Sequence, residues 1–80
     1  MPSAQNVFFL LKSDPKASSS EIARSVRKLP GVKELWMTEG EYSFVARFSV
    51  PECTIQLLES KISSNPRILE TSCLTAPILL

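Results

Sequence analysis

The chain has no histidine, only two glycines and only two cysteines among its 80 residues. Without histidine it lacks the most common general base and metal ligand, so the sequence argues against enzyme chemistry. Cys53 and Cys73 are not arranged in a C-x-x-C motif, so they indicate neither a disulfide framework nor a metal site. We therefore expect a cytoplasmic protein with two free, mostly buried thiols, no cofactor, no metal and no enzymatic activity.

The chain also lacks an excess of charge of one sign and any long hydrophobic run. Nine basic and eight acidic residues give a net charge of +1 and are scattered along the sequence, without the basic patch that is typical of direct nucleic-acid binding. No signal peptide or membrane-spanning segment is evident, so we expect no membrane partner. Residues 1–80 form one expected domain, and Met1 favours a complete chain. A core of this size is marginal alone, which favours self-association.

The first half of the chain has the patterns of a strand, a helix and a strand. Residues 6–12 are apolar on both parities, which predicts a strand covered on both faces. A capping box formed by the serines at 18–20 and Glu21 predicts a helix start. Ile22, Val26 and Leu29 then share one helical face, and Pro30-Gly31 ends the helix. A strand follows directly.

The second half repeats this pattern after a hairpin. Gly40 separates two runs rich in aliphatic and aromatic residues, which is typical of a hairpin turn. Ser49 and Glu52 predict a second capping box, with Pro51 in the first turn of a helix that ends at Asn65-Pro66. A last strand is expected from residue 68 to about 75, followed by an apolar tail. The order β-α-β-β-α-β predicts a ferredoxin-like α+β fold, with two helices on one face of a four-stranded antiparallel sheet.

The third expected strand divides its side chains between two faces. Tyr42, Phe44, Ala46 and Phe48 share one parity, which we expect to face the helices. Val45 and Arg47 then lie on the opposite face, which is partly apolar. Such a face is suited to a subunit interface, and a symmetric dimer is the most common assembly. We expect a homodimer that pairs through the sheet.

Two stretches of the chain resemble the ligand-sensing domain of the Lrp/AsnC family. Residues 29–35 followed by 38–43 are similar to the family pattern in which Pro-Gly-Val leads to Thr-Gly-x-Tyr-Asp, and residues 61–71 are similar to its Lys-Ile-x-x-x-Pro segment before the last strand. In that family the domain, called RAM, dimerises through its sheet and assembles into rings. Small effectors, usually amino acids, bind between the dimers.

The resemblance implies that the hairpin loop forms part of an effector pocket, with Thr38, Gly40, Glu41, Tyr42 and Ser43 as ligand-binding residues. Gly40 lets a ligand approach the backbone closely, and exposed amides and hydroxyls can hold a carboxylate. Ser43 stands where the family usually has Asp, so a carboxylate that would meet an α-ammonium group is missing.

The resemblance also implies how the protein acts. The family's DNA-binding helix-turn-helix precedes the sensor, and this chain begins at the first strand of the sensor. The resemblance therefore implies a stand-alone module that modulates transcription through assembly, with a DNA-binding Lrp/AsnC relative as a possible partner.

Two other functions are compatible with the same order of elements. An RNA-recognition motif is the first, because residues 40–47 partly resemble its RNP1 segment and residues 7–10 its RNP2 segment. The parity of Val45 and Arg47 argues against it, since outward aromatics would bury the Arg47 charge. The second is a small dimeric enzyme of ferredoxin-like fold that needs no metal.

Overall fold

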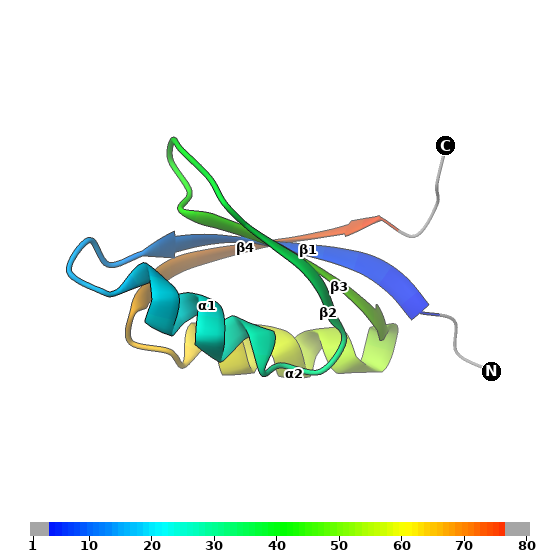
Figure 1. Ribbon diagram of the computed structural model, residues 1–80. Helices are drawn as coiled ribbons and strands as arrows, with labels where there is room; N and C mark the ends of the chain where they lie inside the picture. Colours follow the sequence, from blue (N-terminus) through cyan, green and yellow to red (C-terminus); the bar gives the residue numbers. More distant parts are fainter. Residues whose placement is uncertain (1–3, 77–80) are drawn as a thin grey trace.

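A computed structural model describes residues 4–76 as an α+β fold with two layers. The elements are β1 (Ala4–Ser13), α1 (Ser19–Arg27), β2 (Val32–Met37), β3 (Phe44–Pro51), α2 (Glu52–Ser63) and β4 (Ile68–Ala76). The strands pair antiparallel in the order β2-β3-β1-β4, and both helices cover the same face of the sheet (Figure 1). The predicted ferredoxin-like fold is confirmed. The end of the apolar tail, 77–80, lies outside the described residues.

The core lies between the sheet and the two helices. On β1 and β3 every second side chain points into it, so Val7, Phe9 and Leu11 alternate with half-buried neighbours. Phe9 and Phe48 meet edge to face, with ring centroids 5.4 Å apart, a favoured aromatic geometry. The two helices contribute Ile22, Val26, Leu58 and Ile62 to this core, as their spacing predicts.

The turn from α1 into β2 depends on Gly31. Its φ is +83°, a backbone conformation that residues with a Cβ atom rarely adopt. Its carbonyl accepts a 2.9 Å hydrogen bond from the amide of Ser49. The helix itself ends at Arg27, two residues before the predicted end at Leu29. Gly31 therefore joins the helix-to-strand turn to the neighbouring strand β3.

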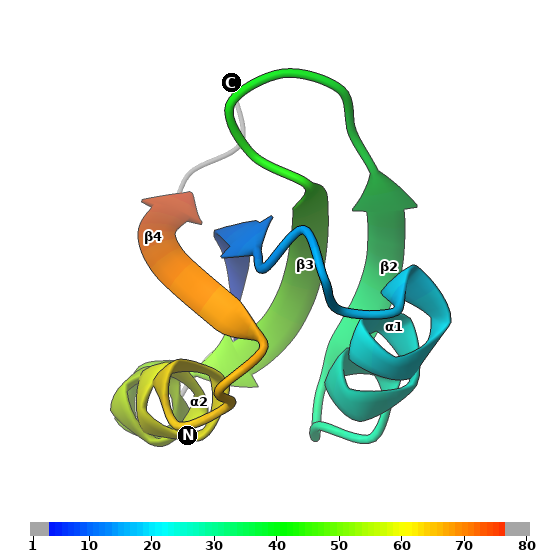
Figure 2. The same ribbon diagram turned by 90° about the vertical axis from the view of Figure 1, so that its left-hand side faces the viewer.

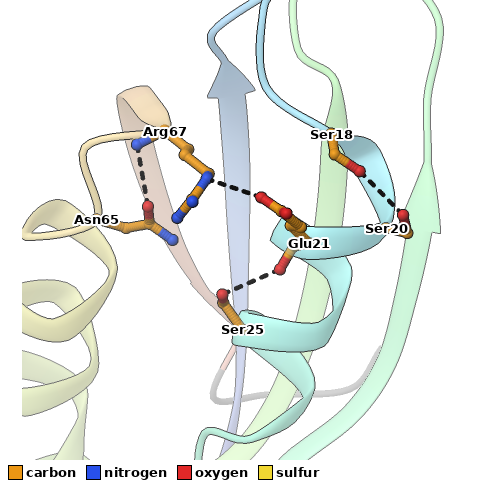
Figure 3. Close-up of polar contacts among 6 residues, drawn as sticks. All are labelled: Ser18, Ser20, Glu21, Ser25, Asn65 and Arg67. Atoms are coloured by element: carbon orange, nitrogen blue, oxygen red, sulfur yellow. Dashed lines mark hydrogen bonds and ion pairs between the residues drawn. The ribbon is translucent and has the colours of Figure 1, made fainter.

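The first predicted capping box is wrong, although Ser18 is the N-cap residue of α1. No side chain caps the helix, because the Ser18 hydroxyl lies 2.9 Å from that of Ser20 instead. Glu21 forms an ion pair with Arg67, at 3.1 Å between Oε2 and Nε, rather than reaching back to the helix start (Figure 3). This pair links α1 to the turn before β4.

The second predicted capping box is also wrong. Ser49 belongs to β3, two residues before the N-cap position of α2, and its amide already donates to the Gly31 carbonyl, so it is not free for the Glu52 side chain. Pro51 takes the N-cap position in an extended conformation, and no side chain caps the helix. Helix α2 then ends at Ser63, just before the predicted Asn65-Pro66 stop.

The two cysteines are free thiols in different surroundings, and we expect them to react at different rates. Cys53 is exposed, which corrects the prediction that it is buried. Burial and the neighbouring carboxylate of Glu59 raise the pKa of Cys73 to about 11 from 9.0. A raised pKa lowers the reactive thiolate fraction at pH 8, by about a hundredfold for Cys73. Mass spectrometry after brief iodoacetamide treatment at pH 8 should find Cys53 modified and Cys73 intact. Equal labelling of both in the native protein would contradict the placement of Cys73.

Residues 4–76 contain neither a membrane-spanning helix nor a cluster of metal ligands. Neither helix is both long and apolar enough to cross a membrane. Within the same residues, no three side chains of His, Cys, Asp or Glu gather where they could hold a metal ion.

Candidate functional site

The loop between β2 and β3 stands clear of the sheet on the side away from the helices (Figures 1 and 2). Its base is closed by two hydrogen bonds from Thr38. The Thr38 amide donates to the Ser43 carbonyl at 2.8 Å, and the Thr38 hydroxyl donates to the Tyr42 carbonyl at 2.7 Å. Thr38 therefore holds the two ends of the loop together.

Ser43 ties the loop to the end of β1. Its amide donates to the Leu11 carbonyl at 2.7 Å, and its hydroxyl oxygen accepts a hydrogen bond from the Ser13 amide at 3.3 Å. The Ser43 side chain is thus directed toward the backbone of β1. It occupies a structural position at the base of the loop.

Tyr42 lies on the face of the sheet away from the helices, which corrects the prediction that it faces the helices. Its hydroxyl is 3.1 Å from that of Ser72 on β4. Ser72 pairs with Leu10 of β1, whose side chain lies on the face opposite the core. The alternation that governs β3 begins only at Phe44, so it does not extend back to Tyr42. The other three members of the predicted set, Phe44, Ala46 and Phe48, are buried.

Gly40 and Glu41 form the exposed tip of the loop. Gly40 has a φ of +120°, and no heavy atom beyond its neighbours lies within 4 Å of where its Cβ would stand. Its surroundings are open, so a ligand has room to approach its backbone. The five residues predicted to bind a ligand therefore share one loop, while their part in binding stays a prediction.

The open face of the sheet presents an apolar surface. Register places Phe8 of β1 opposite Arg47 on one side and Leu74 on the other, and places Val45 opposite Trp36. Opposite residues of antiparallel strands point to the same face. Trp36 and Leu74 keep 45% and 58% of their surface exposed. We call this surface the open face; its apolar side chains are Phe8, Leu10, Trp36, Val45 and Leu74.

Arg47 is held in place within the open face. Its Nε donates to Glu34 Oε1 at 2.5 Å, and its Nη1 donates to Asn6 Oδ1 at 2.9 Å. These contacts lay the guanidinium along the sheet between β2 and β1. The charge is balanced within the chain, so a second apolar surface can cover it without meeting an unpaired cation.

The open face lacks the aromatic pair on the third strand that RNA-recognition motifs use for base stacking. On β3 the outward side chains are Val45 and Arg47, while Phe44 and Phe48 are buried in the core. The observed parity agrees with the sequence-based argument against an RNA-binding surface.

A groove that the sequence analysis missed lies between α1 and the edge of the sheet. It has a volume of about 760 Å³ and is lined by residues of α1 together with Leu35, Met37 and Phe44. The residues that form it are separated along the chain by a turn and a hairpin. The amphipathic pattern of α1 was visible in the sequence, but not the distance between the helix and β2. None of the five predicted ligand-binding residues lines this groove.

The chain matches no protein-family model and no curated protein. Among solved structures it is similar to an AsnC family transcriptional regulator from Agrobacterium tumefaciens, with 16% identity and a TM-score of 0.83 over 99% of this chain and 54% of that one. It is similar to TTHA0845 from Thermus thermophilus, with 19% identity and a TM-score of 0.84 over 95% of this chain and 96% of that one.

A third similar structure is the complex of the transcriptional regulator NMB0573 from Neisseria meningitidis with L-Met. It has 17% identity and a TM-score of 0.74, over 90% of this chain and 49% of that one. The chain therefore spans about half the length of the two regulators and nearly all of the Thermus protein. The fold implied by the resemblance to Lrp/AsnC sensor domains is confirmed, since AsnC regulators share it.

Proposed function

We propose that the protein is an effector-sensing and oligomerisation module of Lrp/AsnC type, which binds a small ligand, an amino acid in the first instance, between dimers. The observation that supports it most is the combination of this fold with an open face that is apolar at its centre. Ligand binding stabilises the assembly that brings the parts of the pocket together, by a free energy that grows with ligand concentration.

The open face supports the dimer. Leucine, valine and aromatic side chains lie together across all four strands, and the one arginine among them is already paired. In an isologous dimer the same side chains of both subunits would be buried at the interface. We propose that two copies pair through this face and that the dimers assemble further into a ring.

The loop at residues 38–43 supports the ligand site. Its base is held by Thr38 and Ser43, whereas the backbone at Gly40 is open to approach. A rigid base with an open tip is suited to holding a carboxylate on backbone amides. The structure of NMB0573 with L-Met makes methionine the first amino acid to test.

Sedimentation velocity over a concentration series, with and without L-methionine and then pools of the other amino acids, tests the proposal. We expect a dimer or larger species whose mass distribution shifts with one amino acid. A dimer whose mass distribution no amino acid shifts would support the proposed assembly and refute the ligand site. A monomer at all concentrations would refute both.

We expect Ser43→Asp to raise the affinity for the amino acid that binds by about tenfold, because a carboxylate can pair with its α-ammonium group. The substitution suits the site, since one carboxylate oxygen of Asp can accept the hydrogen bond from the Ser13 amide while the other pairs with the ammonium group. Isothermal titration calorimetry measures the change. Ser43→Asn is the matched control, with the same shape and no charge. An equal affinity in both variants would show that Ser43 lies outside the pocket.

We further propose that the output passes through co-assembly with a DNA-binding relative of Lrp/AsnC type. The similarity to AsnC family transcriptional regulators supports this partner. Gel filtration of the protein mixed with such a regulator from the same organism should yield a mixed species. Unchanged elution of both components would refute this part of the proposal.

A further inference from the structure

The groove between α1 and β2 lies on the helix side of the sheet, opposite the open face, and ends at Met37 and Phe44, next to the base of the hairpin loop. Leu35 and Met37 pair with Ala46 and Phe44, whose side chains point to the helices. Tyr42, by contrast, contacts Ser72 on the open face. No residue of the proposed amino-acid site lines this groove, so the inference below does not rest on the proposed function.

The wall of the groove on the helix side is basic. Arg24, Arg27 and Lys28 all line it, and their spacing of three and four residues places them side by side on α1. All three are exposed. Within residues 4–76 the ion pairs of basic side chains involve Lys12, Arg47 and Arg67, and none of these three. The groove thus has a positive wall, and none of the residues that line it is acidic.

The opposite wall and the floor are apolar. Phe44 is almost fully buried and forms the floor, Leu35 is half-buried, and Met37 has 71% of its surface exposed. Ala23 gives α1 a small side chain at the centre of the groove, which leaves the space open. An exposed methionine is a flexible apolar surface that adapts to a ligand.

The size and shape of the groove suit a small elongated molecule. Its volume of about 760 Å³ is within the usual range for ligand pockets, which combine an apolar lining with a few placed polar groups. The lining residues on the α1 side extend from Ser19 to the C-cap residue Lys28, the full length of the helix, or about 14 Å at 1.5 Å per residue.

We propose that this groove binds an amphipathic carboxylate, an organic acid with an aliphatic or aromatic body. The carboxylate pairs with the guanidinium groups of Arg24 and Arg27 and with the Lys28 ammonium, in charge-assisted hydrogen bonds. The apolar body lies along Leu35 and Met37 over the ring of Phe44. Neither a neutral apolar molecule nor a cation of the same length satisfies both walls.

Calorimetric titration with octanoate tests the proposal, with octanol and octylammonium as probes of equal chain length. We expect octanoate to bind at least about tenfold more tightly than octanol, and octylammonium not to bind. The absence of octanoate binding, or equal binding of octanoate and octanol, would overturn the proposal. Binding of an acidic peptide in place of octanoate would also overturn it.

Substitutions in the basic wall test whether octanoate binds in this groove. The triple variant Arg24→Gln, Arg27→Gln, Lys28→Gln should weaken octanoate binding by about tenfold or more and leave octanol unchanged. The matched control is Lys16→Gln, Lys33→Gln, Lys61→Gln, which removes the same charge from residues that do not line this groove. Equal losses in both would mean attraction by net charge alone, and would contradict the site.

The apolar wall is tested separately. Met37→Ser should weaken octanoate binding by about fivefold or more, since it removes apolar contact along the chain. Leu57→Ser on α2 is the control, because Leu57 is also an exposed apolar residue and lies outside the groove. A loss with Leu57→Ser but not with Met37→Ser would place octanoate elsewhere.

Discussion

Leu74→Asp is expected to convert the proposed dimer into a monomer without unfolding the chain. Leu74 lies on the open face beside Phe8 and keeps 58% of its surface exposed, so a carboxylate there remains hydrated in a monomer. In a dimer formed through this face the same carboxylate would be buried against apolar side chains, and burial of an unpaired charge is strongly unfavourable.

The size of the effect follows from symmetry. An isologous interface contains each substitution twice. A loss of about 1.5 to 3 kcal/mol per buried leucine therefore becomes about 3 to 6 kcal/mol for the dimer, or at least about a hundredfold in the dissociation constant. Sedimentation velocity over a concentration series measures this change, and circular dichroism verifies that the monomer is folded.

Leu57→Asp is the matched control. Leu57 is 51% exposed on α2, on the other side of the molecule from the open face, and the chemical change is the same. We expect this variant to assemble as the unmodified chain does. A normal dimer of Leu74→Asp, or monomers of both variants, would be evidence against pairing through the open face.

Gly31→Ala is expected to cost about 3 kcal/mol of folding free energy. A Cβ atom at this position would lie 2.3 Å from Cγ1 of Val50 and 3.0 Å from the carbonyl oxygen of Ser49. Val50 is buried and β-branched, so it cannot rotate away easily. The φ of +83° adds about 1 to 2 kcal/mol for a residue with a side chain. The Tm should fall by at least about 10 °C.

Gly40→Ala separates the clash from the backbone strain. Gly40 also has a positive φ, but nothing lies within 4 Å of its would-be Cβ, so only the strain applies. We expect a loss of about 1 kcal/mol and a fall in Tm of about 5 °C. Both variants must be melted at one protein concentration, because self-association shifts the Tm. Equal losses at the two glycines would disprove the close approach of Gly31 to β3.

The fold was predictable because the local signals agreed with one another. The apolar face of Ile22 and Val26, the glycine turn at Gly31 and the alternation from Phe44 onward each point to the same arrangement, and each is found in the structure. Agreement between local preference and global fold is what makes a short sequence interpretable.

The capping boxes were not predictable from the sequence pattern, because other partners occupy the groups that would form them. Glu21 pairs with Arg67, 46 positions further along the chain, and the Ser49 amide bonds to Gly31. A capping motif is defined by residues of the first helical turn alone, so it contains no information on such partners. Both helices form without these caps, since their apolar faces are buried against the sheet.

Tyr42 and the groove were missed for related reasons. The prediction for Tyr42 assumes that the alternation of β3 begins two residues before Phe44. At that point the hydrogen bonds of Thr38 and Ser43 turn the backbone away from strand geometry. The groove depends on the spacing between α1 and β2, which no periodicity in either element encodes.

The contact between Tyr42 and Ser72 makes one side chain common to two surfaces. Tyr42 starts in the hairpin loop and its hydroxyl reaches Ser72 of β4, which is separated from β3 by β1 in the sheet. A ligand that displaces this ring would alter the surface that a second copy meets, and dimerisation would alter the ring that the ligand meets. Linkage makes the two effects equal in free energy. Effector affinity would then rise or fall with protein concentration, by the same factor with which the effector changes the dimer.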